Sequence, residues 1–155
     1  LRKVFDRDIA DNDSFSFEGK RIYPIKEDGA IDMDREFTHL TTECVEDIDE
    51  NNKKYNVRVY DAHRSERLHW IKQHIEKKVN DSSIEIFSVE ERDTSNRIDV
   101  IRTYIYNKTR KYVIVLEPQL RSGRAYYLLT AYYLNKNYGE KAIKKKMKKK
   151  LNNVL

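Results

Sequence analysis

Four strand-like segments in the second half of the chain restrict its fold more than any other feature. They are "SIEIFSVEE" (83–91), "RIDVIRTYIYN" (97–107), "YVIVLEP" (112–118) and "RAYYLLTAYYL" (124–134). All four are rich in β-branched and aromatic residues, and the last two connectors, "KTRK" and "QLRSG", are short. Such connectors join antiparallel neighbours, because a parallel crossover needs about a dozen residues or more. The sequence therefore predicts an antiparallel four-stranded meander.

A long amphipathic helix is predicted immediately before these strands. Asp61 can cap the start of a helix that runs over residues 62–80. At about 100° per residue, one apolar stripe of this helix contains Leu68, Ile71, Ile75 and Val79. We therefore expect an α+β fold in which the long helix packs on one face of the four-stranded antiparallel sheet.

The chain is expected to have three segments within one domain, as its 155 residues suggest. Residues 1–56 are polar and turn-rich and predict an N-terminal extension with short strands, including a hairpin around Gly19 and a strand over 35–45. Residues 57–137 contain the predicted helix and antiparallel sheet. Residues 138–155 predict a lysine-rich C-terminal helix.

Charge is distributed unevenly along the chain. The net charge is +5, but the stretch from residue 101 onward has fourteen Lys and Arg residues against two Glu residues. A basic C-terminal half beside an acidic N-terminal half favours a polyanionic partner, and we expect RNA. The lysine-rich tail "KAIKKKMKKKL" is alternatively a membrane-surface helix or merely solvated.

One flank of the predicted helix carries residues suited to RNA chemistry. Within about 60° of one another on the helical wheel lie His63, Arg67, Trp70 and His74. Imidazoles transfer protons, a guanidinium neutralises phosphate and an indole stacks on bases. The alternative is a helix flank whose Trp70 covers the core edge while the histidines sit in water.

Two cations lie at the edges of the apolar stripe. Arg64 and Lys72 must there either extend to solvent or be paired. Each is a candidate for phosphate binding, and a structural salt bridge is the alternative. His69 points away from the flank, toward solvent.

Strict alternation divides the last strand into two faces. One face has Ala125, Tyr127, Leu129, Ala131 and Tyr133, which suit a core beneath a helix. The other has Arg124, Tyr126, Leu128, Thr130 and Tyr132, with Arg121 in the preceding loop. Arginine can hold a phosphate, threonine can hydrogen-bond it and tyrosine can stack on bases. The alternative is a sheet buried on both sides, with tyrosine hydroxyls bonded to the backbone.

Several catalytic and localisation signals are missing from the sequence. It has no P-loop, no GxSxG or HExxH motif and no Cys/His metal set. We therefore expect no cofactor and no metal site. No run approaches the roughly 18 apolar residues that span a bilayer, and the single Cys44 fits a reducing cytoplasm. We expect a cytoplasmic protein without a membrane span.

Residues 57–134, with "YDAHRSERLHWIKQHI", "YVIVLEP" and "YYLLTAYYL", resemble a known family. They are similar to the phage and polymorphic-toxin branch of the barnase, EndoU, colicin and RelE group of endoribonucleases. The resemblance implies metal-independent RNA cleavage through attack by the ribose 2′-hydroxyl. It implies His63 or His74 as base or acid, Arg64 and Arg124 as phosphate ligands, and Thr130 or Tyr132 as orienting groups. His39 is a further histidine that can enter the site.

Three functions follow from these observations. The first is an endoribonuclease-like domain of bacterial or phage origin, such as a toxin with an acidic antitoxin or immunity protein, either cytoplasmic or delivered within a larger toxin. The second is a noncatalytic RNA-binding or interaction module with a related fold. The third is a structural phage or surface module whose tail is a solvated helix.

Overall fold

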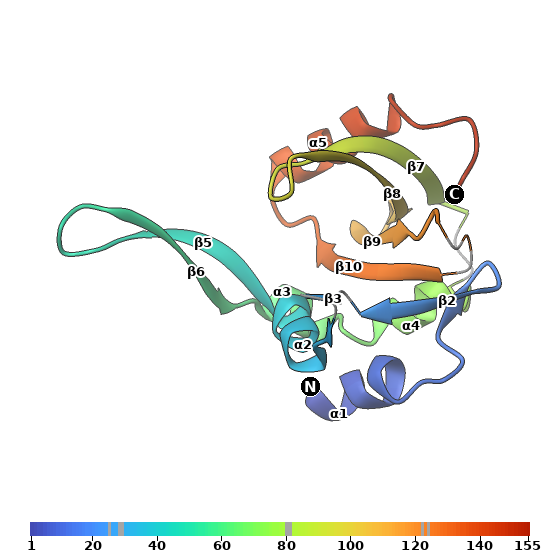
Figure 1. The fold of residues 1–155 in the computed structure, drawn as a ribbon, viewed down its shortest axis with the longest axis horizontal. Helices are drawn as coiled ribbons and strands as arrows, with labels where there is room; N and C mark the ends of the chain where they lie inside the picture. Colours follow the sequence, from blue (N-terminus) through green and yellow to red (C-terminus); the bar gives the residue numbers. More distant parts are fainter. Residues whose placement is uncertain (25, 28–29, 80–81, 122, 124) are drawn as a thin grey trace.

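A six-stranded mixed sheet forms the body of the protein (Figure 1). The computed structural model describes all residues except 25, 28–29, 80–81, 122 and 124. The strand order is β1-β2-β10-β9-β8-β7. The strands are β1 (Ser16–Phe17), β2 (Lys20–Pro24), β7 (Ile84–Asp93), β8 (Ile98–Asn107), β9 (Tyr112–Pro118) and β10 (Ala125–Tyr133). Strand β2 runs parallel to β10, whereas the other neighbours are antiparallel.

The predicted fold class is wrong, although part of the predicted pairing is present. Strands β7 to β10 pair in sequence order as an antiparallel meander. They belong to a larger mixed sheet, however, because β2 from the N-terminal segment adds to the β10 edge. No long helix packs on this sheet in the part of the chain that the structure describes. The pairing of β2 with β10 was not predicted, because the residues of a short strand do not indicate which distant strand it pairs with.

The predicted long helix is two short helices. They are α3 (Ala62–Glu66) and α4 (Trp70–Ile75), separated by a turn over residues 67–69. Around the turn, hydrogen bonds run from residue i to i−3, as from the Leu68 amide to the Ser65 carbonyl. This tighter winding rotates successive side chains by about 120° instead of 100°. Leu68, Ile71 and Ile75 are nevertheless buried, as the apolar stripe predicts.

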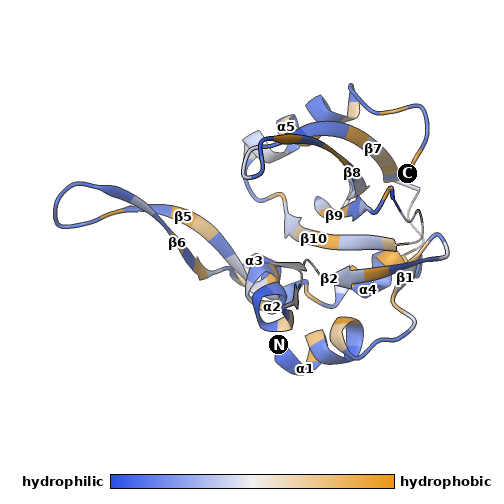
Figure 2. Ribbon diagram, in the orientation of Figure 1, coloured by the Kyte–Doolittle hydropathy of each residue, from blue (hydrophilic) through white to orange (hydrophobic). Residues whose placement is uncertain are grey.

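Apolar side chains cover both faces of the sheet. On one face Ile114, Leu116 and Leu128 join Leu68 and Ile71 and the N-terminal aromatics in one cluster. That side is covered by α4 and by α1 (Arg2–Phe5), η1 (Asp6–Ala10) and α2 (Met33–Thr41). Figure 2 shows hydrophobic bands on β10, α4 and the N-terminal helices. The sheet is therefore buried from this side by segments far apart in sequence.

Helix α5 (Asn137–Met147) covers the opposite face. Ile143 is buried there with Phe87, Tyr104 and Val113. Glu91 on β7 links the sheet to the helix, because its carboxylate accepts hydrogen bonds from Arg102 and Tyr104 of β8 and from Lys146 of α5. Burial opposes ionisation of Glu91, but the bonds from Lys146 and Tyr104 outweigh it and lower its pKa. The predicted lysine-rich helix thus has one apolar, packed side.

A two-stranded hairpin projects from the body (Figure 1). It consists of β5 (Thr42–Ile48) and β6 (Lys54–Tyr60). A second small ribbon pairs β3 (Lys26–Glu27) with β4 (Ala30–Ile31). At the other end of the molecule, the hairpin predicted around Gly19 is confirmed: Glu18 and Gly19 both have positive φ, as a tight two-residue turn requires. Among the described residues, none of the helices is both long and apolar enough to cross a membrane.

Candidate functional site

The Arg64 guanidinium joins three segments that are distant in sequence. Asp61 caps α3 by accepting a hydrogen bond from the Arg64 amide at 3.1 Å, which fixes Arg64 in the first turn. The Nη1 of Arg64 donates to the Thr130 hydroxyl of β10 at 3.2 Å and to the His39 carbonyl of α2 at 3.1 Å. Asp61 Oδ2 also lies 3.3 Å from Arg64 Nε. Two of the candidate site residues, Arg64 of α3 and Thr130 of β10, are therefore in direct contact.

Thr130 is accessible to Arg64 because β10 loses its edge partner. Strand β2 pairs with β10 only as far as Leu128, and α3 and α2 take its place beyond that point. A β-bulge between Leu128 and Thr130 interrupts the pairing with β9. Bulges of this kind re-aim side chains at the ends of strands. The site thus lies at a local break in the sheet.

The same bulge overturns the predicted division of β10 into two faces. Tyr126 and Leu128 join the cluster under α4, together with Ala131. Leu129 and Tyr132 pack on the opposite side, with the cluster under α5. Strict alternation had grouped Leu129 with Ala131 and Tyr126 with Tyr132. One inserted residue moves each later side chain of the strand to the opposite face of the sheet from the one that strict alternation predicts.

Tyr132 completes the immediate surroundings of Arg64. Its ring centroid lies 5.8 Å from the guanidinium carbon, a cation–π contact. Burial raises the pKa of Tyr132 to about 12, against the lowering effect of the Arg64 charge. The phenol is therefore protonated at neutral pH. It can donate a hydrogen bond to an anion, but it cannot act as a base.

His39 is the residue at this site that the sequence analysis misplaced. A strand was predicted over 35–45, but α2 occupies Met33–Thr41 because the Asp32 side chain accepts from the Arg35 amide and caps a helix. Burial, together with the nearby charges of Arg58 and Arg64, lowers the pKa of His39 to about 4. The imidazole is therefore neutral at pH 7. The sequence signal for this helix is Asp32, because aspartate is one of the residue types that cap the start of helices.

We expect the His39 imidazole to titrate near pH 4. Replacing Arg58 by alanine should raise that midpoint, because the Arg58 charge disfavours protonation. Between the ordinary histidine value of 6.5 and about 4, the unfolded chain binds a proton that the folded chain does not, so stability falls as pH falls through this window. NMR titration of the imidazole measures the midpoint. An ordinary midpoint near 6.5 in the folded protein would contradict this account of the site.

A row of cations and aromatic rings extends from the site along α3 and α4. We define this arginine–aromatic row as His63, Tyr133, Arg67, Trp70 and Arg110. The His63 and Tyr133 rings are 5.3 Å apart, and the Arg67 guanidinium lies 4.1 Å from the Tyr133 ring and 5.2 Å from Trp70. The Arg110 guanidinium, in the β8–β9 turn, also lies against Trp70, 5.3 Å from the centroid of its ring. Such alternation of positive charge and π surface suits a single-stranded nucleic acid.

His74 belongs to the core and not to the exposed row, although its ring contacts Trp70. It is 3% exposed, and its ring is tilted against Trp70 and Tyr112. Asn107 donates to His74 Nε2 at 3.1 Å, so Nδ1 carries the proton and donates to the Trp70 carbonyl at 2.8 Å. The prediction had placed His74 beside His63 on an open flank. The turn between α3 and α4 rotates it inward instead, and its bonds give it a structural role.

Tyr126 and Lys72 also lie away from Arg64. Tyr126 is 1% exposed, packs on Phe17 and donates to the Leu155 carbonyl at 2.9 Å. Burial of this kind matches the alternative in which tyrosine hydroxyls bond to the backbone. Lys72 lies 3.7 Å from Glu76 and lines a separate pocket between α4 and the N-terminal helices. Neither side chain contributes to the cluster around Arg64.

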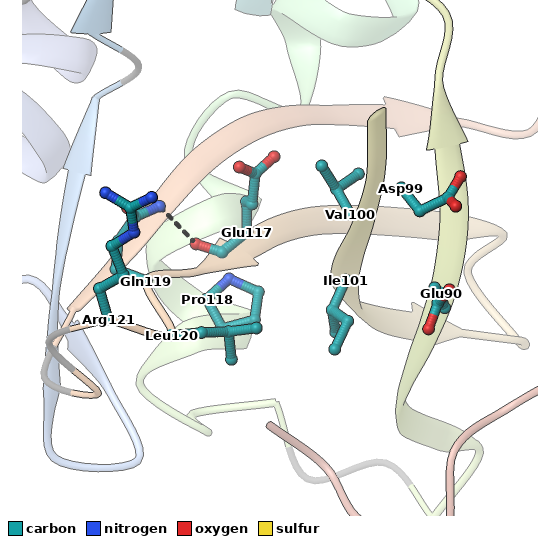
Figure 3. A pocket seen from close by; sticks show the side chains of 9 residues that line it. All are labelled: Glu90, Asp99, Val100, Ile101, Glu117, Pro118, Gln119, Leu120 and Arg121. Atoms are coloured by element: carbon teal, nitrogen blue, oxygen red, sulfur yellow. Dashed lines mark hydrogen bonds between the residues drawn. The ribbon is translucent and has the colours of Figure 1, made fainter. Parts of the chain in front are cut away.

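Arg121 lies at the other end of β10 from Thr130. It lines a pocket of about 410 Å³ together with three carboxylates, Glu90, Asp99 and Glu117 (Figure 3). Burial raises the pKa of Glu117. This acidic lining does not suit a phosphate group. The predicted phosphate ligand Arg124 lies outside the described residues.

Within the described part of the chain, no group of three His, Cys, Asp or Glu side chains is arranged to hold a metal ion.

Comparisons of the chain with protein-family models, with curated proteins and with solved structures find no match. The functional argument therefore rests on the geometry of the site.

Proposed function

We propose that the protein is a metal-independent endoribonuclease whose reacting centre contains Arg64, Thr130 and His39. The observation that supports this proposal most strongly is the convergence of the half-buried Arg64 guanidinium, the Thr130 hydroxyl and the His39 carbonyl at one break in the sheet. The His39 imidazole is neutral and senses the Arg64 charge. These groups supply a cation for phosphate, a donor that orients it and a base. Tyr132 adds a protonated phenol beside the same guanidinium.

The chemistry assigns one role to each group. The neutral His39 imidazole takes the proton of the ribose 2′-hydroxyl, and that oxygen attacks the adjacent phosphorus. The bond from phosphorus to the 5′-oxygen breaks, leaving a 2′,3′-cyclic phosphate. The 5′-oxygen receives a proton from His63, the exposed imidazole one residue before Arg64. Arg64 and Thr130 hold the nonbridging oxygens, whose charge develops during the attack.

RNA is the proposed partner, and the arginine–aromatic row is its proposed track. Arg67 and Arg110 neutralise phosphates, while Trp70 and Tyr133 offer π surfaces for bases. We further propose that the endoribonuclease acts as a toxin of bacterial or phage origin. A cell that makes such a toxin needs an inhibitor, so an acidic antitoxin or immunity protein belongs to the proposal. We place the activity in the cytoplasm, where RNA is abundant.

Purified protein incubated with RNA in EDTA tests the proposal. Wild-type protein should cleave RNA. Thr130→Val should slow cleavage, because it keeps the shape but removes the hydroxyl, whereas Thr130→Ser should retain most of the rate. His39→Ala should lower the rate by about 10²-fold or more, as loss of a general base does. The matched control is Arg92→Ala, which removes an exposed arginine ion-paired to Asp99.

The row of cations and rings also favours noncatalytic RNA binding as the second candidate function. Intact RNA with wild-type protein in EDTA, together with salt-sensitive binding that Arg67→Ala weakens, would replace the nuclease by this alternative. Cleavage that proceeds equally in the Thr130→Val and His39→Ala variants would contradict the proposed centre.

A further inference from the structure

The β5–β6 hairpin is an arm without a core of its own. Its strands pair from Thr42↔Tyr60 to Ile48↔Lys54, and within the described part of the chain no other strand joins either edge. Every residue from 42 to 60 is exposed or half-buried, and the arm extends well beyond the sheet (Figure 1). An isolated two-stranded hairpin is at best marginally stable in water. A surface that covers the arm would therefore stabilise it.

One face of this arm is apolar. Residues directly opposite each other in an antiparallel pair share a face, so Val45 and Val57 lie together, with Val59 toward the base and the Tyr55 ring toward the tip. We call these four residues the valine face. Val59 is 39% exposed and Tyr55 is 45% exposed. The Tyr55 hydroxyl donates to Asp47 at 3.1 Å, which holds its ring over the same face. The arm thus presents a continuous apolar row to solvent.

Charge differs between the two ends of the arm. The outer end, residues 46–50, has four carboxylates within five residues. The base lies beside positive charge, because Glu43, on the same face as the valines, is 3.9 Å from the ammonium of Lys136 in the β10–α5 connection. Helix α5 begins at the next residue and exposes Lys141 and Lys144. The valine face is therefore acidic at its outer end and bordered by lysines at its inner end.

We propose that the valine face is covered by the same face of a second copy of this chain, in a two-fold symmetric dimer. A two-fold interface uses the same patch on both copies, so the two apolar rows stack and exclude water from each other. If the arms cross antiparallel, each acidic outer end meets the lysine-bordered base of the other copy, whereas parallel arms would bring the two acidic ends together. A seven-residue strand spans about 23 Å, enough to reach from one base to the other. The dimer does not depend on the proposed RNA cleavage.

Sedimentation equilibrium of the purified protein tests this inference. The wild-type protein should form a dimer. Val57→Lys should raise the dimer dissociation constant by about tenfold or more, because it places a charge at the centre of the apolar contact. Asn56→Lys is the matched control, since it introduces the same side chain at the neighbouring position on the opposite face, and it should leave the dissociation constant unchanged.

An exchange of charges gives a second measurement that leaves the valine face intact. Glu50→Lys in the arm and Lys141→Glu in α5 are both at exposed positions, and each should weaken the dimer. Combined in one chain they should restore it, because every contact between an outer end and a base then has both charges reversed. A wild-type protein that stays monomeric, a dimer that Val57→Lys leaves unchanged, or a combined variant no tighter than either single variant would overturn the inference.

Discussion

If Arg64 acts in the proposed RNA cleavage, we expect Arg64→Ala to lower kcat/KM by about 10²–10³-fold, the effect of removing one fixed donor to a developing oxyanion. The guanidinium is already positioned, because Asp61, Thr130 and the His39 carbonyl hold it. A fixed cation needs no reorganisation when charge develops on the phosphate oxygens. Arg64→Lys should recover only part of the rate, since an ammonium cannot reproduce the planar fork of donors. Steady-state kinetics on a short RNA measure both variants.

Stability must be measured alongside this rate, because Arg64 also joins α3, α2 and β10. Removing it leaves the Thr130 hydroxyl and the His39 carbonyl without that donor. Urea unfolding distinguishes the two effects: the expected loss of rate persists under conditions where the variant is fully folded. A folded Arg64→Ala protein with a rate within about threefold of wild type would remove Arg64 from the reacting centre.

We expect His74→Ala to destabilise the protein by about 3–4 kcal/mol. The substitution leaves a cavity against Trp70 and Tyr112, and it leaves Asn107 and the Trp70 carbonyl without their buried partner. Urea unfolding measures the change in free energy. The rate of RNA cleavage by the folded fraction should stay close to that of wild type, since His74 touches no part of the proposed centre.

A structural role and a catalytic role of His74 predict opposite effects of its replacement on stability and on the rate of RNA cleavage. A large loss of cleavage with unchanged stability would restore the catalytic role that the helical wheel suggested. His74→Gln is an informative companion variant, because its amide can replace one hydrogen bond but not the aromatic packing. We expect it to fall between wild type and His74→Ala in stability.

Local patterns in the sequence were sufficient for several parts of the structure. The apolar period placed Leu68, Ile71 and Ile75 in the core, and short connectors indicated the antiparallel order of β7 to β10. Each of these inferences depends on residues close together in the chain.

The remaining features depend on contacts between distant segments or on single-residue irregularities. The bulge after Leu128 changes which tyrosines face which side, and no residue type announces it. The tighter winding at residues 67–69 rotates His74 about the helix axis, so that its side chain is buried in the core and not exposed to solvent. The parallel addition of β2 and the lowered pKa of His39 require the folded arrangement of α2, α3 and β10.

Cleavage of a short RNA carrying a single 2′-deoxynucleotide tests the central claim most directly. The all-ribose RNA, incubated with wild-type protein in EDTA, should yield a 2′,3′-cyclic phosphate and a 5′-hydroxyl, identified by mass spectrometry. The 2′-deoxy substitution at the cleavage position should block cutting there, because the attacking oxygen is absent. Cleavage that continues at the deoxy position, or RNA that remains intact with folded wild-type protein, would contradict the account.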